Sequence, residues 1–317
     1  MMDRSFTFTV LVLTYNPKEP SLYRTLYSAI NQKDVSFEIV ISDDGSSVFD
    51  REGIVGFFAD HGFTDYTICM NTPNKGTVSN VLAGVRASRG EYIKCISPGD
   101  FFYDEHTLSK ALRILEGPSS EVLFGKAAHY RIDEHGEIMI KNVNFPHDLD
   151  AYRSGNEKKI TFNYIFHRDY ILGASFVVRK DLYERYLPII EGRLRYEEDA
   201  CVIPMVCDGF IPVFMDEFIV WYESDSGISN DPDSKWTAIL AGENREIYRI
   251  LGETGRYDRR VCGWWSGEDK GLLTLAFRFF NHFHWEKVWN AEKRNCHNDR
   301  EADVSILRDI IGRYCPD

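Results

Sequence analysis

Residues 77–102 read TVSNVLAGVRASRGEYIKCISPGDFF, and this stretch contains the pattern that decides the fold. Its first part, up to residue 90, has apolar residues at helical spacing and ends in glycine, as helices often do. The apolar run that follows at once, at 91–96, is typical of a buried strand. The SPG sequence at 97–99 interrupts regular structure and leaves a single carboxylate, Asp100, at the break. We therefore expect a helix, a strand and then an exposed acid.

The same alternation extends back to the N-terminus. Strand-like apolar runs occupy 6–16, 36–45 and 66–71, and helical patterns occupy 21–32 and 48–62. Short connections between alternating strands and helices favour right-handed crossovers and a parallel sheet. The strands are nearly continuous in apolar residues, which indicates helices on both faces. We expect an α/β fold with a mostly parallel sheet flanked by helices.

Polar side chains follow each of these strands. They are Thr14, Tyr15 and Asn16, then Asp43, Asp44 and Ser46, then Asn71 and Asn74, and finally Asp100. The carboxyl ends of parallel strands share one edge of the sheet, where ligands of such folds bind. Each acid also has a simpler explanation as a turn or helix-capping residue, and for Asp43-Asp44-Gly45-Ser46 alone a turn is the stronger interpretation.

Composition restricts the class of protein. The 317 residues carry a formal net charge of -12, which argues against a nucleic-acid partner because phosphate binding needs a basic face. The seven cysteines lack CxxC spacing and indicate free thiols in a reducing compartment. No stretch approaches the ~20 apolar residues of a membrane span, and the N-terminal apolar run resembles a core strand rather than a signal peptide. We expect a cytoplasmic protein.

Five segments, in this order, resemble the family 2 glycosyltransferases. They are VLVLTYNP, EIVISDDGSS, NKGTVSNVLAGVRASRGEYIKCISPGDFF, GASFVVRKDLYE and RYEEDACVIPMV. The resemblance covers roughly residues 6–230. It implies an inverting enzyme with a Rossmann-like GT-A fold that moves a sugar from a nucleotide-diphosphate sugar, with UDP-sugar as the expected donor, to a hydroxyl of a glycan or lipid-linked acceptor.

The resemblance also implies a domain division. We expect a GT-A domain at 1–230, with a nucleotide-binding half (1–104) and an acceptor-binding half (105–230). A helical, aromatic-rich extension would follow at 231–317.

The resemblance assigns nucleotide-binding roles residue by residue. Thr14 and Tyr15 would lie against the base, Asp44 would accept a hydrogen bond from the uracil N–H, and Asp43 would support the same pocket. Asn74 and Gly76 would lie along the nucleotide and ribose. Leu82 departs from the family, whose members often carry Asn there.

Metal binding and catalysis are assigned in the same way. Asp100 matches the last acid of the family's metal motif, so Mn²⁺ or Mg²⁺ is implied. Relatives often carry acids where this chain has Ser97 and Gly99, so one carboxylate would hold the metal largely alone, with other ligands from diphosphate and water. Asp199, next to Glu198, matches the catalytic base, which must take the proton of the attacking hydroxyl.

A loop after the last strand is implied to close over the diphosphate or acceptor, with Tyr222, Ser226 and Ser229 as candidates. The main alternative from another class is a non-catalytic relative that binds nucleotide sugar as a partner subunit. A dinucleotide-binding enzyme or a P-loop NTPase would need Gly-rich motifs that the chain lacks.

Two features of the C-terminal part remain open. A zinc site could be imagined from Cys262, His282, His284, Cys296 and His297, but their spacing matches no known zinc pattern. The aromatic stretch at 264–294 has Leu272, Ala276, Phe279 and Phe283 at helical spacing, which favours burial against the catalytic domain. The alternative is peripheral contact with the inner face of the membrane, with Trp264, Trp265, Trp285 and Trp289 near the interface.

Overall fold

The computed structural model describes residues 6–117, 121–141, 145–224, 234–255, 257–272, 274–276, 279–280 and 302–313. Its first half is a parallel sheet with strand order β3-β2-β1-β4. The strands are β1 (Phe6–Thr14), β2 (Phe37–Asp43), β3 (Tyr66–Met70) and β4 (Gly90–Ile96). The helices between them are α1 (Glu19–Ile30), α2 (Arg51–Asp60) and α3 (Thr77–Ala87). The helix and strand predicted from residues 77–102 are confirmed.

The sheet continues past β4 as β8-β6-β9-β5, with β7 paired to β6. These strands are β5 (Phe101–Phe102), β6 (Val122–Ile132), β7 (Ile138–Lys141), β8 (Phe176–Arg179) and β9 (Val213–Glu223). Strand β8 is antiparallel to both β4 and β6, whereas β6 and β9 are parallel. The expected α/β fold is confirmed, and the parallel order holds for the first four strands while the second half is mixed.

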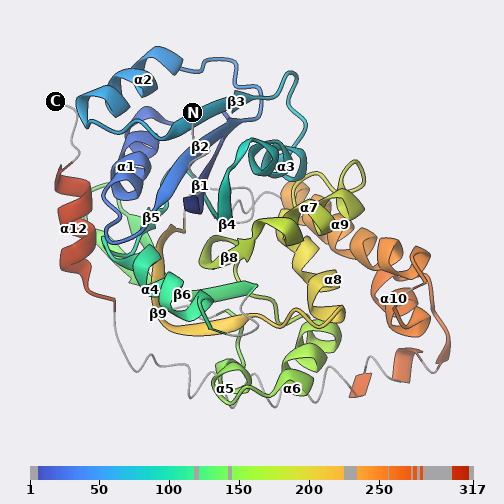
Figure 1. Cartoon of the computed structure of the whole chain (residues 1–317). Helices are drawn as coiled ribbons and strands as arrows, with labels where there is room; N and C mark the ends of the chain where they lie inside the picture. The colour runs from blue at the N-terminus through green and yellow to red at the C-terminus, as the bar shows by residue number, and fades with distance from the viewer. Residues whose placement is uncertain are drawn as a thin grey trace.

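Helices cover both faces of the sheet (Figure 1). The later helices are α4 (Thr107–Leu115), α5 (Leu149–Arg153), α6 (Glu157–Phe162), α7 (Lys180–Ile190), α8 (Val202–Cys207), α9 (Ser234–Glu253), α10 (Arg259–Ser266) and α12 (Val304–Arg313). Side chains alternate along β1, so that Val10 and Val12 pack with α1 and α2, and Leu11 and Leu13 pack with α3. The sheet therefore separates two hydrophobic cores, one on each of its faces.

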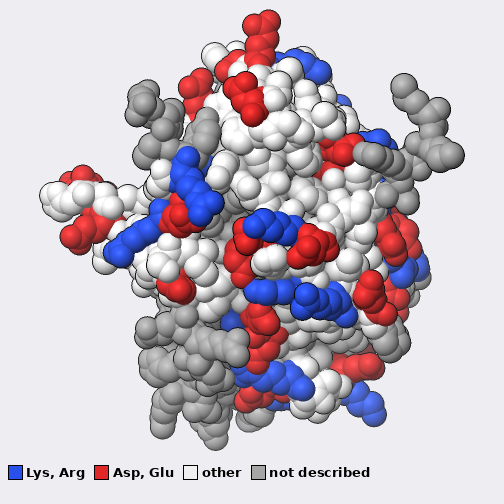
Figure 2. Space-filling model, turned by 60° about the vertical axis from the view of Figure 1, so that its left-hand side comes forward, with Lys and Arg blue, Asp and Glu red and all other residues white. Residues whose placement is uncertain are grey.

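A third apolar cluster anchors the turn that follows β4. Phe101 and Phe102 are both buried, and Phe101 packs with Tyr130, Trp221 and Leu307 of α12. Helix α12 thus lies beside α1 at the outer edge of the fold (Figure 1). On this side of the molecule, positive and negative side chains are interspersed (Figure 2).

The C-terminal aromatic residues are distributed differently from both expectations. Trp264 is buried and stacks on Trp265 at 5.0 Å, and the Trp265 Nε1–H donates to the Ile165 carbonyl at 2.8 Å. Burial therefore contradicts the membrane-interface role for Trp264, whereas Trp265 is half-buried and its role stays a prediction. The burial predicted for Leu272 and Phe279 was also wrong, since they are 85% and 67% exposed. Among the described residues, no helix is long and apolar enough to cross a membrane.

Phe283, Trp285 and Trp289 lie outside the described residues.

Candidate active site

The ends of β1 and β2 are tied together by polar side chains. The Thr14 hydroxyl donates to Asp43 Oδ2 at 2.9 Å, and the Ser46 N–H donates to Asp43 Oδ1 at 2.8 Å. Thr14 and Asp43 are buried, whereas Tyr15 is 56% exposed. Thr14 and Asp43 thus shape the sheet edge from within, and Tyr15 presents its ring beside them.

Asp44 organises the loop after β3. Its Oδ1 accepts hydrogen bonds from Asn71 Nδ2 at 3.1 Å and from the Lys75 N–H at 2.9 Å, and its Oδ2 accepts from the Gly76 N–H at 2.7 Å. A carboxylate has about four acceptor positions, so three donors leave room for one more. Asp44 therefore fixes the loop while retaining capacity for one ligand donor.

Gly76 brings this loop against the segment that carries Asp199. Its φ is +91°, and a Cβ there would lie 2.2 Å from Arg195 Cγ and 2.5 Å from the Arg195 carbonyl oxygen. That carbonyl accepts the Val78 N–H at 3.2 Å, in the first turn of α3, and the Arg195 guanidinium donates to Asn74. Glycine is required here by both conformation and contact.

Leu82, at the position where relatives often carry Asn, is buried in the core.

Asp100 is buried and receives a backbone donor from β9. The Glu223 N–H donates to Asp100 Oδ1 at 3.0 Å. Gly99 has a φ of +104°, and a Cβ on it would lie 2.3 Å from Glu223 Oε2. The Glu223 carboxylate thus occupies the space that a side chain at residue 99 would need. Burial raises the pKa of Asp100 to about 7.

A buried lysine lies between the two acidic parts of the site. Lys94 Nζ donates to the carbonyls of Cys95 at 2.6 Å and Ala174 at 2.7 Å. Burial lowers the pKa of Lys94 to about 8, and the Asp100 charge opposes that shift. A Cβ on Gly173, the neighbour of Ala174, would lie 3.4 Å from Asp199 Oδ2. Lys94 therefore supports the backbone that packs on Asp199.

Asp199 opens onto a cleft of about 240 Å³. The other lining residues are Phe145, His147, His167, Arg168, Asp169, Tyr170, Ile171 and Leu172. Burial raises the pKa of Asp199, and a hydrogen bond from the Glu197 side chain opposes this rise. Burial and the charges of Asp199, Glu198 and Glu243 raise the pKa of Glu197. The hydrogen bond between the two side chains therefore favours a proton on Glu197 and the ionised form of Asp199.

Glu198 does not line this cleft. Burial is the main cause of the raised pKa values of Cys95 and Tyr183, and the Glu198 charge adds to both, so Glu198 lies near these core-side groups. The two acids predicted as a catalytic pair thus lie in different environments, and Asp199 is the one with access to a ligand.

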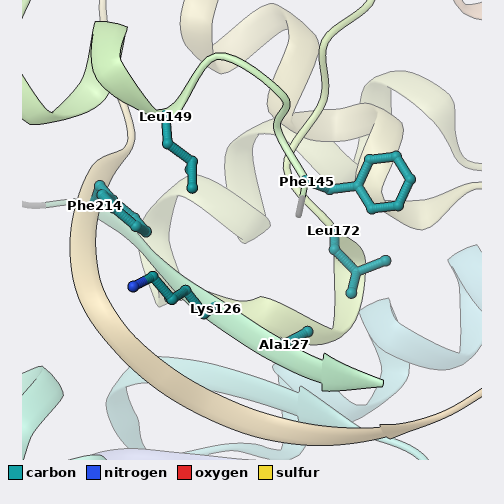
Figure 3. A pocket seen from close by; sticks show the side chains of 7 residues that line it. Lys126, Ala127, Phe145, Leu149, Leu172 and Phe214 are labelled. Atoms are coloured by element: carbon teal, nitrogen blue, oxygen red, sulfur yellow. The ribbon is translucent and has the colours of Figure 1, made fainter. Parts of the chain in front are cut away.

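The wall of the cleft is firmly packed. Phe145 and Leu172 line it and also border a gap of only about 10 Å³ over strand β6, with Leu149 and Phe214 on the opposite side (Figure 3). A gap of this size holds at most about one water molecule. Beneath it, Lys126 forms an ion pair with Asp216. Part of the cleft wall therefore packs closely on the residues that cover β6.

The loop and zinc predictions fall partly outside the described residues. Ser226 and Ser229 lie outside them, as do His282, His284, Cys296 and His297. Tyr222 packs edge-on against His129 at 5.0 Å, and Cys262 is buried. Within the part of the chain that the structure describes, no three His, Cys, Asp or Glu side chains are grouped to hold a metal ion.

Sequence reasoning missed several residues of this site. Arg195 and Glu197 stand in the same RYEEDACVIPMV string as Asp199 and could have been included, whereas Lys94 and Glu223 reach the site only through the tertiary fold.

Comparisons with known proteins agree with this architecture. The model of the family described as Glycosyl transferase family 2 matches residues 9–187, more than half of the chain. An uncharacterized glycosyltransferase of Rickettsia bellii (strain RML369-C) is 25% identical over 136 residues. That match covers 43% of this chain and 19% of the relative, so the chain spans about a fifth of that protein's length.

Solved structures share the fold at low identity. S. aureus TarS 1-349 in complex with UDP has a TM-score of 0.54 at 14% identity, covering 91% of this chain and 92% of that one. The same protein with UDP-GlcNAc has a TM-score of 0.53 at 15% identity, covering 97% and 91%. The Pyrobaculum calidifontis mannosyltransferase PcManGT, with GDP-Man and Mn²⁺, has a TM-score of 0.55 at 13% identity, covering 99% and 77%.

Proposed function

Because this chain belongs to glycosyltransferase family 2, we propose that it transfers a sugar from a nucleotide-diphosphate sugar to a hydroxyl of a glycan or lipid-linked acceptor, with inversion at the anomeric carbon. The observation that carries this proposal is Asp199, which lines a cleft and whose segment is joined through Arg195 to the loop held by Asp44. A base and a nucleotide site are thus parts of one connected structure.

Asp199 is the proposed general base. Inversion by a single displacement requires the acceptor hydroxyl to lose its proton as it attacks, so a carboxylate must lie within hydrogen-bond reach of it. The hydrogen bond from Glu197 favours the ionised form of Asp199. Asp169 holds the cleft in shape, because its carboxylate accepts the His147 N–H at 2.7 Å and the Asp148 N–H at 3.1 Å.

The proposed donor is a UDP-sugar. Asp44 retains room for about one further donor, which suits the single imide N–H of uracil better than the adjacent N–H and NH₂ groups of guanine. The Tyr15 ring, exposed at the end of β1, is placed to pack on the base. Asn74 and Gly76 would then follow the ribose.

The proposed metal is Mn²⁺ or Mg²⁺. Both ions prefer oxygen ligands, and the carboxylates of Asp100 and Glu223 are brought together at Gly99, which has no side chain to separate them. These two residues would hold the ion together, whereas the sequence suggested Asp100 as the only protein ligand. When bound, the ion would offset the charge that develops on the leaving diphosphate.

The test is turnover of UDP-sugars with Mn²⁺ by wild-type protein and by Asp199→Asn. We expect the variant to bind UDP with unchanged affinity by calorimetry and to lose ~10²–10⁴-fold in turnover, the usual worth of a general base. The alternative, a non-catalytic partner subunit that binds nucleotide sugar, predicts UDP binding without turnover in either protein. Equal turnover in both proteins would exclude Asp199 as the base.

A further inference from the structure

The segment that leads into Asp199 is held by one side chain from α9. Glu243 Oε1 accepts the Arg195 N–H at 2.9 Å, and its Oε2 accepts the N–H groups of Tyr196 and Glu197, also at 2.9 Å each. Three consecutive backbone donors therefore converge on one carboxylate. This is the strongest single attachment of the segment, since hydrogen bonds to a charged group exceed neutral ones.

Neighbouring contacts bring α9 to the same segment. Arg193 donates to Glu246 at 2.8 Å and to Glu253 at 2.6 Å, and the Tyr196 ring packs edge-on against Trp236 at 5.2 Å. These ion pairs lie near the surface and contribute little to stability by themselves. They show that α9 and the segment run along one another, with Glu243 facing the backbone of residues 195–197.

The opposite side of the segment touches the proposed nucleotide loop. The Arg195 carbonyl accepts the Val78 N–H, and its side chain lies over Gly76 and donates to Asn74. Residues 195–197 are thus enclosed between that loop and α9. Their backbone position sets where Asp199 stands relative to the nucleotide.

We propose that Glu243 is a positioning residue for sugar transfer, which fixes the backbone of residues 195–197 so that Asp199 faces the acceptor in register with the nucleotide loop. This inference rests on the proposed function. It gives α9, the first helix of the proposed C-terminal extension (231–317), a direct part in the active site, although the family match ends at residue 187.

Glu243→Gln tests this role directly, because both carboxylate oxygens of Glu243 accept backbone N–H groups. An amide has one acceptor oxygen and one NH₂ group, and each Glu243 oxygen receives at least one N–H. Either orientation of the substituted amide therefore sets an NH₂ against a backbone donor. The side-chain volume is unchanged, so packing of α9 is preserved.

The matched control is Glu253→Gln. Glu253 lies on the same helix and is exposed, and it accepts from the Arg193 side chain rather than from the backbone. Amide hydrogen exchange of residues 193–199 should be faster in Glu243→Gln and unchanged in Glu253→Gln. UDP affinity by calorimetry should stay within about threefold, while kcat falls ~10- to ~100-fold in Glu243→Gln, since small misplacements cost this much.

A further readout separates positioning from general loss of structure. Burial, and then the charges of Asp199, Glu198 and Glu243, raise the pKa of Glu197, so Glu197 should lose its proton at lower pH in Glu243→Gln. The alkaline limb of the kcat/KM profile should therefore move to lower pH, while the acid limb set by Asp199 stays in place. Unchanged exchange, or unchanged kcat in a variant with faster exchange, would overturn the inference. A different outcome would overturn the proposed function. If the wild-type protein binds UDP but shows no turnover, the chain is not a transferase, and Glu243 has no part in catalysis even if exchange is faster in Glu243→Gln.

Discussion

Substitution of Gly76 by Ala tests the contact between the proposed nucleotide loop and the segment before Asp199. With φ +91° and ψ 167°, Gly76 has a conformation open essentially only to glycine, which costs another residue ~1–3 kcal/mol. The added methyl would also lie 2.5 Å from the Arg195 carbonyl oxygen, and backbone atoms cannot move aside as a side-chain end can. Such overpacking costs a further ~1–3 kcal/mol, so we expect a total loss of about 2–6 kcal/mol in the free energy of unfolding.

Gly209 provides the control. Its φ is +94°, nearly that of Gly76, but a Cβ there would meet nothing within 4 Å. Gly209→Ala should therefore show the conformational cost alone, ~1–2 kcal/mol, with no change in UDP affinity. Urea unfolding of both variants, followed by tryptophan fluorescence, gives the difference directly. Equal losses in stability, or unchanged UDP affinity in Gly76→Ala, would show that the loop does not depend on its approach to Arg195.

Two further predictions concern the buried charges. Lys94→Met removes a buried amine whose pKa falls from 10.5 to about 8 in the folded chain, so the unfolded chain binds more protons between these values. The free energy of unfolding of the wild type should accordingly rise by about 3 kcal/mol relative to that of the variant from pH 8 to pH 10.5. Urea titrations of both proteins across this pH range measure the difference. If the difference in free energy does not change with pH, the lowered pKa of Lys94 is contradicted. Glu223→Gln should weaken Mn²⁺ binding with UDP by ~10-fold or more in an electron paramagnetic resonance titration. Glu217→Gln, on the same strand and paired with Lys110 at 3.3 Å, should leave it unchanged, and equal affinities would remove Glu223 from the site.

The first half of the fold could be predicted because its signals are local. Apolar runs mark β1 to β4, and the break at residues 97–99 marks the end of β4. Helix α3 ends at Ala87, and the glycine expected to end it, Gly90, is the first residue of β4. The direction of β8 could not be predicted in the same way. It pairs antiparallel with β4 and β6, and strand direction depends on the path of the chain between β4 and β8 rather than on the FVVR sequence itself.

The residues of the candidate site also divide into those that the local sequence predicts and those that it does not. Asp44 and Asp100 follow β2 and β4, so their position at one edge could be expected from strand order. Asp199 lies on the short helix Glu198–Cys201 and was expected only from the family resemblance. Glu223 is 123 residues from Asp100, and Glu243 is 46 to 48 residues from the backbone it holds. No periodicity connects residues at such distances, because the contacts exist only after the sheet and α9 have packed.

Residue 99 is glycine where relatives often carry an acid, and residue 223 is an acid that lies against it. These two features are linked. Any side chain at residue 99 would need a φ of +104° and would collide with the Glu223 carboxylate. An acid at 99 and an acid at 223, both in these conformations, exclude each other. The loss of a carboxylate within the loop therefore need not mean the loss of a metal ligand, since β9 supplies one at the same place. On this argument a double variant, Gly99→Asp with Glu223→Ala, should recover more Mn²⁺ affinity than Glu223→Ala alone, and failure to do so would separate the two features.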